Sequence, residues 1–296
     1  MELSWVMRLR IAASAATGVI LIGFLAWLSA APEPLGAVSA DTISGGGKVT
    51  LVGLAFLTGL LAYFVSWPYG REIGVLAVPS GLAIWAVRCG SMTGLMRANP
   101  SFTQRQALFS ALKWEPLFWL AVLAAGFAGV LVGWKIRARP HSDQAKDNAA
   151  SNSSVYSNAV VALIGSALIA QLCIAVLARD VRIFDNKLGS VVAQPATGQI
   201  VFAVCFSFGL AAFVFKKFLD VSYVWPTIAS GALTFFAIIT YVKQDVLEHL
   251  VQRWPAPFFP NVVVSILPLQ MVAFGALGSF AGYWMAVRCN YWRKHA

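Results

Sequence analysis

Charged residues are scarce in this sequence, and long stretches lack them altogether. Only 11% of the 296 residues are Asp, Glu, Lys or Arg, whereas 59% are hydrophobic. Soluble domains contain about 25% charged and about 45–50% apolar residues, so the composition excludes an ordinary soluble domain. The mean hydropathy of +0.73 is typical of a protein that crosses a membrane several times.

Eight runs contain no Asp, Glu, Lys or Arg, and each is a candidate membrane span. They cover 11–32, 49–70, 73–87, 116–134, 148–178, 188–215, 221–242 and 254–287. A hydrocarbon core of about 30 Å requires about 20 apolar residues of helix, and only the third run is clearly shorter. That run contains Pro79, and Arg88 after it must extend to the interface. We therefore predict an all-α integral membrane protein with about eight transmembrane helices.

Short motifs recur in the two halves of the chain. The sequence "VPSGLAIWAV" at 78–87 resembles "IASGALTFFA" at 228–237. The sequence "AGFAG" at 125–129 likewise resembles "GSFAG" at 278–282. Weak internal similarity of this kind is typical of membrane folds that are built from repeats.

The one long polar stretch lies between these motifs. Residues 137–157 are rich in Ser, Asn, Asp and Ala, a composition typical of a flexible linker. We therefore predict a tandem repeat, with a first four-helix membrane half at 1–136 and a second at 158–296. An even number of helices in each half gives both the same orientation, related by an axis along the membrane normal.

Small residues gather at corresponding places in the two predicted halves. Helices in a bilayer associate through close packing, which small side chains permit. The predicted helix-packing residues are Ser80, Gly81, Ala125, Gly129, Gly133, Ser230, Gly231, Gly278 and Gly282. We expect the fourth and eighth helices to pack against each other through these small residues, near the axis between the halves. The alternative is a narrow path between the halves that is lined by backbone.

Ionisable residues are absent from the interior of the eight runs. Because a charge inside a membrane costs about 2.5–3.5 kcal/mol or more, such residues usually serve transport or catalysis. The most polar interior side chains are Gln171 and Gln270, which we expect to form hydrogen bonds between helices. Contact with a substrate is the alternative. The runs offer no titratable relay for proton-coupled transport and no ring of charges for an ion channel.

Residues that build metal, cofactor and catalytic sites are equally few. The three histidines, His141, His249 and His295, lie outside the helix cores and have no metal-site spacing. The chain has no Gly-rich phosphate loop and no Gly-x-Ser-x-Gly motif, and its four cysteines form no redox motif. We therefore predict no catalytic residue, no metal site and no cofactor.

A membrane enzyme is the third interpretation, and it would need polar groups at the loops. The candidates are Glu115, Asp180, Asp185 and His249. Asp180 and Asp185 alternate with basic residues in "RDVRIFDNK", which favours a solvated, salt-bridged loop over a cation site.

Two further segments have one apolar side, and in each of them a basic residue directly precedes a Trp. They cover 101–116 and 243–260, and we expect Trp114 and Trp254 to anchor them at the membrane interface. A docking surface for a partner, or a gate over a cleft between the halves, is the alternative. The sequence "WPAPFFPN" at 254–261 is predicted to be exposed and to insert into lipid or another subunit.

These features favour a membrane protein without a recognisable catalytic site. We expect an accessory, scaffold or assembly subunit whose partners are membrane lipids and other membrane-protein subunits or further copies of the chain. The alternative is a permease-like transporter of a neutral or lipid-like substrate between the two halves. The pI of about 9.7 reflects basic residues that flank the helices, so we expect no binding to nucleic acid.

The basic residues also predict an orientation. Twelve of the 22 Lys and Arg residues flank one side, which includes the cluster "KIRAR" at 135–139 and the C-terminal "RKHA". We therefore predict a multi-pass protein of the cell membrane with both termini in the cytoplasm. The alternative for the N-terminus is a signal peptide covering residues 1–31.

Overall fold

The structure, a computed structural model, describes residues 5–30, 39–137, 152–254 and 257–295. Helices dominate these residues, and seven of them are long and apolar enough to cross a membrane. The seven correspond to the first seven charge-free runs. The described part of the chain is therefore that of an all-α membrane protein, as the composition predicted.

The elements before the polar stretch are almost all helical. They are α1 Trp5–Gly18, the π-helical η1 Val19–Ala26, α2 Trp27–Ala30, η2 Ala40–Thr42, α3 Gly45–Val65, α4 Gly70–Ile73, η3 Gly74–Leu76, α5 Ala77–Arg88, α6 Met92–Ala98, α7 Phe102–Leu112 and α8 Glu115–Arg137. The elements after it add a short hairpin. They are α9 Asn152–Leu177, β1 Arg182–Asp185, β2 Gly189–Val192, α10 Thr197–Leu219, α11 Val224–Tyr241, α12 Gln244–Arg253, η4 Val262–Ser265 and α13 Pro268–His295.

Two charge-free runs are longer than the helices that they contain. In the last run, 254–287, α13 begins at Pro268. In the sixth run, 188–215, β2 comes first and α10 begins at Thr197. The predicted linker is shorter than expected, since α9 begins at Asn152; residues 138–151 of it lie outside the described residues.

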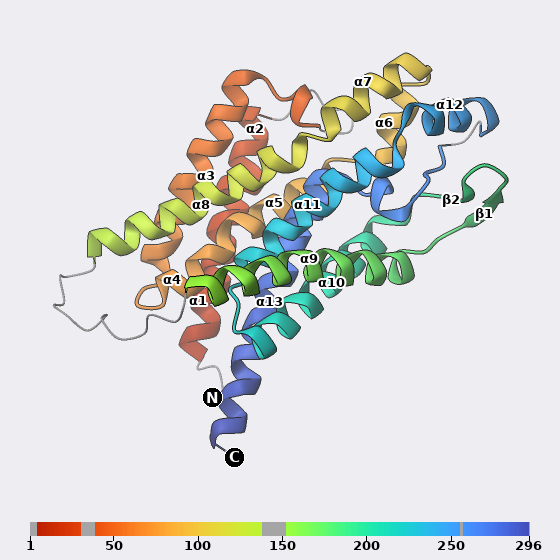
Figure 1. The fold of residues 1–296 in the computed structure, drawn as a ribbon. Helices are drawn as coiled ribbons and strands as arrows, with labels where there is room; N and C mark the ends of the chain where they lie inside the picture. Colours follow the sequence, from red (N-terminus) through yellow and green to blue (C-terminus); the bar gives the residue numbers. More distant parts are fainter. Residues whose placement is uncertain (1–4, 31–38, 138–151, 255–256, 296) are drawn as a thin grey trace.

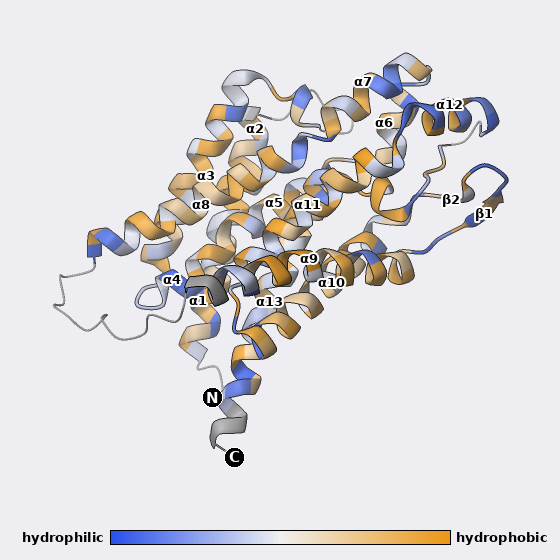
Figure 2. Cartoon of the chain, in the orientation of Figure 1, coloured by the Kyte–Doolittle hydropathy of each residue, from blue (hydrophilic) through white to orange (hydrophobic). Residues whose placement is uncertain are grey.

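The long helices run side by side, and the shorter elements gather at the two ends of the bundle (Figure 1). The start of α1, the end of α13 and α4 lie at one end, called here the termini end. Helices α6, α7 and α12 and the β1–β2 hairpin lie at the other, called the hairpin end. Hydrophobic residues occupy most of the length of the helices, whereas hydrophilic residues lie mainly at both ends of the bundle (Figure 2). This pattern fits a bundle whose flanks face lipid.

In the first half, glycines bring α3 and α8 into close contact. A Cβ added at Gly129 would overlap the carbonyl oxygen of Phe56, and one at Gly59 would overlap that of Gly126. A Cβ at Gly133 would meet the ring of Tyr63. These positions therefore require glycine because backbone or ring atoms occupy the space of a side chain.

A similar contact joins α10 and α13. A Cβ at Gly278 would overlap the carbonyl of Cys205, and one at Gly282 would overlap that of Gly209. The glycine faces of α8 and α13, the fourth and eighth predicted helices, thus pack against α3 and α10. The two helices do meet, as expected, but the expectation that these small residues form their contact is wrong. The physical reason is that a small-residue face specifies close approach but not its partner.

The remaining predicted packing residues lie in further helix contacts. Gly81 of α5 approaches the backbone of Gly18 in α1, and Gly231 of α11 meets the side chain of Leu120 in α8. Ser230 lies against Gly275 of α13. Of the other two, Ser80 of α5 donates to the carbonyl of Leu76 in the preceding η3, and Ala125 is half-buried in α8.

Helices α8 and α13 meet through aromatic rings. The ring centroids of Phe127 and Phe280 are 6.0 Å apart, with planes at 85°. Tyr223, just before α11, packs on Phe280 at 4.3 Å. Aromatic side chains therefore fill the contact that the sequence assigned to small residues.

Candidate functional site

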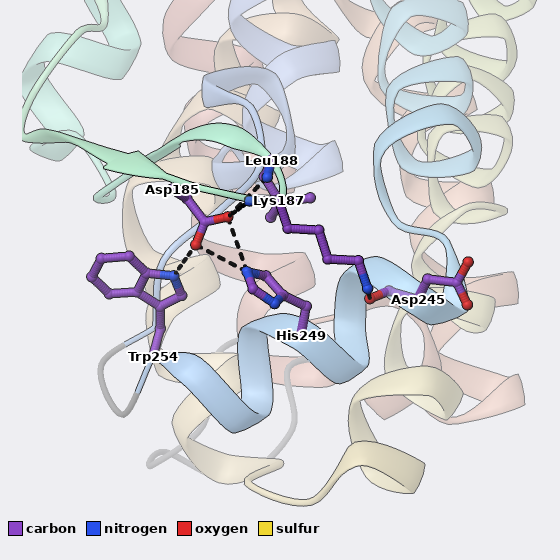
Figure 3. Close-up of polar contacts among 6 residues, drawn as sticks. All are labelled: Asp185, Lys187, Leu188, Asp245, His249 and Trp254. Carbon is purple, nitrogen blue, oxygen red and sulfur yellow. Dashed lines mark hydrogen bonds and ion pairs between the residues drawn. The ribbon is translucent and has the colours of Figure 1, made fainter.

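A buried carboxylate, Asp185, is the centre of a polar cluster at the hairpin end. His249 Nε2 lies 2.9 Å from both of its carboxylate oxygens. The indole N–H of Trp254 donates to Oδ2 at 2.9 Å, as Figure 3 shows. The backbone N–H groups of Lys187 and Leu188 donate to Oδ1 at 2.9 and 2.8 Å. Asp185 therefore joins the hairpin to α12 and to the residue that follows it.

The local sequence explains how this carboxylate reaches its partners. Asp185 is the last residue of β1 and pairs with Gly189, whose φ of 73° permits the tight turn between the strands. The side chain of Asp185 accepts from the turn amides, the usual role of Asp in such turns. In α12, Leu247 and Leu250 are buried, which leaves His249 facing the hairpin.

The cluster favours the ionised form of Asp185. Burial disfavours the charge, but the hydrogen bonds from His249, from Trp254 and from the two turn amides outweigh it. Together they hold the pKa of Asp185 well below its usual value. An ionised carboxylate only accepts hydrogen bonds, so His249 Nε2 is the donor.

Two predictions for this region are wrong, and Trp254 has a contact that the sequence did not indicate. Asp185 is 4% exposed and forms a hairpin with its neighbours, whereas a solvated loop was expected. Asp180 is exposed, so the two carboxylates do not form a pair. Phe259, predicted to be exposed, is fully buried and bridges to Val192 of β2. Trp254, the predicted interfacial anchor, uses its N–H to hold the hairpin.

The hydrogen bonds of the cluster suit a structural role, in which Asp185 holds the hairpin against α12 and Trp254. An Asp–His pair serves catalysis when the histidine in turn activates a nucleophile. Among the described residues, His249 bonds to Asp185 and to no Ser, Thr or Cys side chain. The described residues also contain no group of three or more His, Cys, Asp or Glu side chains that would hold a metal ion.

Glu115, placed by sequence at an outer loop, is buried in the first turn of α8. It is 4% exposed, and its Oε1 accepts the backbone N–H of Ala40 at 2.6 Å. Trp119 is also fully buried, and among the described residues its indole N–H has no hydrogen-bond partner at normal geometry. The carboxylate thus fixes the η2 segment against α8.

The two predicted interior glutamines both form hydrogen bonds between helices. Gln270 Nε2 donates to the carbonyl of Ala86 at 3.2 Å and to that of Gly90 at 3.5 Å. Gln171 Nε2 donates to the hydroxyl of Tyr241 at 3.1 Å, which links α9 to α11. Gln270 is fully buried.

A cavity of about 200 Å³ lies at the hairpin end, between α7, α11 and α12. Its lining is partly polar and partly apolar: Gln106, Phe109, Ser110, Lys113, Ile238, Ile239, Val242, Gln244 and Leu247. The two predicted amphipathic segments thus meet here as α7 and α12, and α7 begins at a capping box of Ser101 and Gln104. Trp114, the other predicted anchor, is 55% exposed beside Phe235, with centroids 5.5 Å apart.

Sequence reasoning missed this cavity because its lining comes from separate segments. No short motif joins Lys113 to Ile238 or Gln244; only the contact of α7 with α11 and α12 brings them together. The usable signal was the pair of amphipathic segments. Comparison with known protein families, with curated proteins and with solved structures gave no match.

Proposed function

We propose that the chain is a non-catalytic accessory or scaffold subunit of the cell membrane. It packs against lipid and against other membrane proteins, and both of its termini face the cytoplasm. The extensive exposed apolar flanks support this role. On α9 alone, Ile164, Leu168, Leu172 and Val176 are each more than half exposed along one side, and all are apolar.

The hydrogen bonds of Gln270 carry the proposal. In a transporter built from two halves, a polar group at their contact is expected to line the substrate path. The side-chain amide of Gln270 instead donates to a backbone carbonyl of α5, and its Oε1 accepts the backbone N–H of Leu267. A fully buried amide with these partners favours a closed contact between the halves.

A permease-like transporter is the second candidate, and the arrangement of the halves favours it. Phe127 and Phe280 occupy matching places in the repeated "AGFAG" and "GSFAG" motifs, and they touch each other. Contact between equivalent residues is characteristic of a two-fold relationship. We accordingly retain the tandem repeat as part of the proposal, with α8 and α13 at its axis.

The accessibility of native thiols separates the two candidates. Cys89 is fully buried, and its thiol contacts the Ala86 carbonyl at 3.1 Å, the same carbonyl that Gln270 binds. Cys289 is exposed in the C-terminal part of α13 and serves as the positive control. The experiment treats right-side-out and inside-out vesicles with a membrane-impermeant maleimide and identifies the modified cysteines by peptide mass spectrometry.

A scaffold predicts that Cys89 stays unmodified from both sides until the protein is denatured. Cys289 is modified from the cytoplasmic side, which also tests the orientation. Alternating access predicts modification of Cys89 from at least one side under native conditions. That result would replace the scaffold by the permease.

A further inference from the structure

We propose that the cavity between α7, α11 and α12 binds the headgroup of an anionic phospholipid, with Lys113 paired to its phosphate. This inference rests on the proposed association with lipid, and it is independent of any partner subunit. Three features of the cavity support it: its divided lining, its charge and its place beside an exposed apolar surface.

The lining has a polar part and an apolar part, as a phospholipid does. Gln106, Ser110 and Lys113 of the α7 segment supply an amide, a hydroxyl and an ammonium group. Ile238 and Ile239 of α11 supply aliphatic surface next to them. A phospholipid presents the same change from polar to apolar over a short distance. A soluble polar ligand would leave the isoleucines without a suitable partner.

The charge of the cavity selects an anion. Lys113 is the only ionisable side chain in its lining. Among the described residues, its ammonium has no carboxylate partner and lies 5.5 Å from the ring centroid of Trp114. The ammonium is therefore available to a phosphate. Gln244, the first residue of α12, also lines this cavity, and no side chain caps this N-terminus.

The size of the cavity limits it to the headgroup. Sites that enclose a drug-sized ligand have about 300–1,000 Å³, and this cavity has about 200 Å³. The acyl chains must therefore lie outside it. Ile239 and Phe236 of α11 are 46% and 62% exposed and one helical turn apart, so they offer an apolar track that begins at the cavity.

The depth of the site also fits a headgroup. Trp114 is more than half exposed and directly follows Lys113. Tryptophan is enriched where the hydrocarbon core meets the polar headgroups. The cavity lies at the hairpin end, where the apolar flanks give way to hydrophilic residues (Figure 2).

The test is native mass spectrometry of the full-length protein in a neutral detergent. The protein is titrated with phosphatidylglycerol or with phosphatidylcholine of the same acyl chains. The wild-type protein is expected to bind phosphatidylglycerol about fivefold more tightly, the factor expected for one lysine near an anionic headgroup. Lys113→Gln is expected to abolish the preference. Lys243→Gln, which removes a nearby exposed lysine outside the lining, is expected to retain it.

Equal binding of the two lipids by the wild-type protein would overturn the proposal without reference to any variant. A preference that survives in Lys113→Gln would overturn it as well. Displacement of phosphatidylglycerol by millimolar inorganic phosphate would show a free-anion site, not a lipid site. Ile239→Ser provides an independent check, because it is expected to weaken both lipids while leaving the preference. The absence of partner polypeptides would contradict the subunit role but leave this test unaffected.

Discussion

Phe127 of α8 and Phe280 of α13 meet edge to face where these two helices contact each other, with ring centroids 6.0 Å apart. The two residues lie 153 positions apart in the sequence, and each is the central Phe of a recurring motif. Around them, glycines hold α8 to α3 and α13 to α10. The bundle thus contains two tightly packed helix pairs, α3 with α8 and α10 with α13, which meet at an aromatic contact, and four predictions follow from its parts.

The aromatic contact is expected to couple the halves energetically. Phe127→Leu and Phe280→Leu should each lower the free energy of unfolding, and the double-mutant cycle should give a coupling of about 0.5–1.5 kcal/mol. Phe202 and Phe206, stacked at 5.8 Å on the exposed side of α10, are the matched control pair. Unfolding in mixed micelles measures both cycles. Additive effects of the two substitutions on the free energy of unfolding would show that the two rings are not coupled and would contradict this prediction.

Close packing of α8 on α3 predicts a sharp difference between two glycines. Gly129→Ala should destabilise the protein by about 1–3 kcal/mol, because the added methyl overlaps the Phe56 carbonyl. Gly53→Ala in α3 should be neutral or stabilising by up to about 1 kcal/mol, since its Cβ meets no atom within 4 Å. Melting temperatures in detergent compare the two variants. Equal melting temperatures would contradict the close crossing.

The Asp185 cluster predicts a stability that depends on pH at the acid end. The folded pKa of Asp185 lies below the unfolded value of about 3.9. The stabilisation is therefore complete above pH 4 and is lost as the pH falls from there through the folded pKa. The protection factors of the amides of residues 182–192, which are corrected for the intrinsic pH dependence of hydrogen exchange, should thus fall below pH 4 in the wild-type protein.

Asp185→Asn provides the control for that titration. The variant should show lower protection factors in the hairpin already at pH 7, and a smaller further fall in acid, because the titrating group is gone. His249→Gln should share the first effect and keep part of the second, since the turn amides still bind the carboxylate. An identical acid response in wild type and Asp185→Asn would assign it to other carboxylates.

Glu115 is expected to stabilise the η2 segment through its bond to the Ala40 amide. Glu115→Ala leaves that amide without its partner and should cost about 1–3 kcal/mol. Glu115→Gln retains a carbonyl oxygen at the same reach and should cost less. Melting temperatures in detergent measure the order of the two variants. A glutamine variant as unstable as the alanine variant would show that the charge, and not the acceptor, is required.

The sequence predicted the helices well where composition alone decides them. Runs without charges become long helices because the bilayer admits little else. The start of α7 also has a local signal in the sequence, because its capping box joins Ser101 to Gln104 only three residues later. The start of α13 at Pro268 was missed because the apolar residues before it look the same in an extended segment as in a helix.

Contacts between distant segments were harder to predict. Gly129 and Gly282 were expected at a helix contact, and they lie at one, but the partner helix is specified by the whole bundle. Asp185 was read as solvated because it alternates with basic residues. Its burial depends on His249 and Trp254, which follow 64 and 69 residues later, and no local motif links them to it.

The most direct test of the scaffold role is native mass spectrometry of the protein extracted gently from its own membrane. A subunit that packs against other membrane proteins should be released together with them in fixed stoichiometry. The partner masses would then identify the process it serves. A lone monomer or dimer that retains no other polypeptide across several mild detergents would contradict the scaffold role and favour the permease.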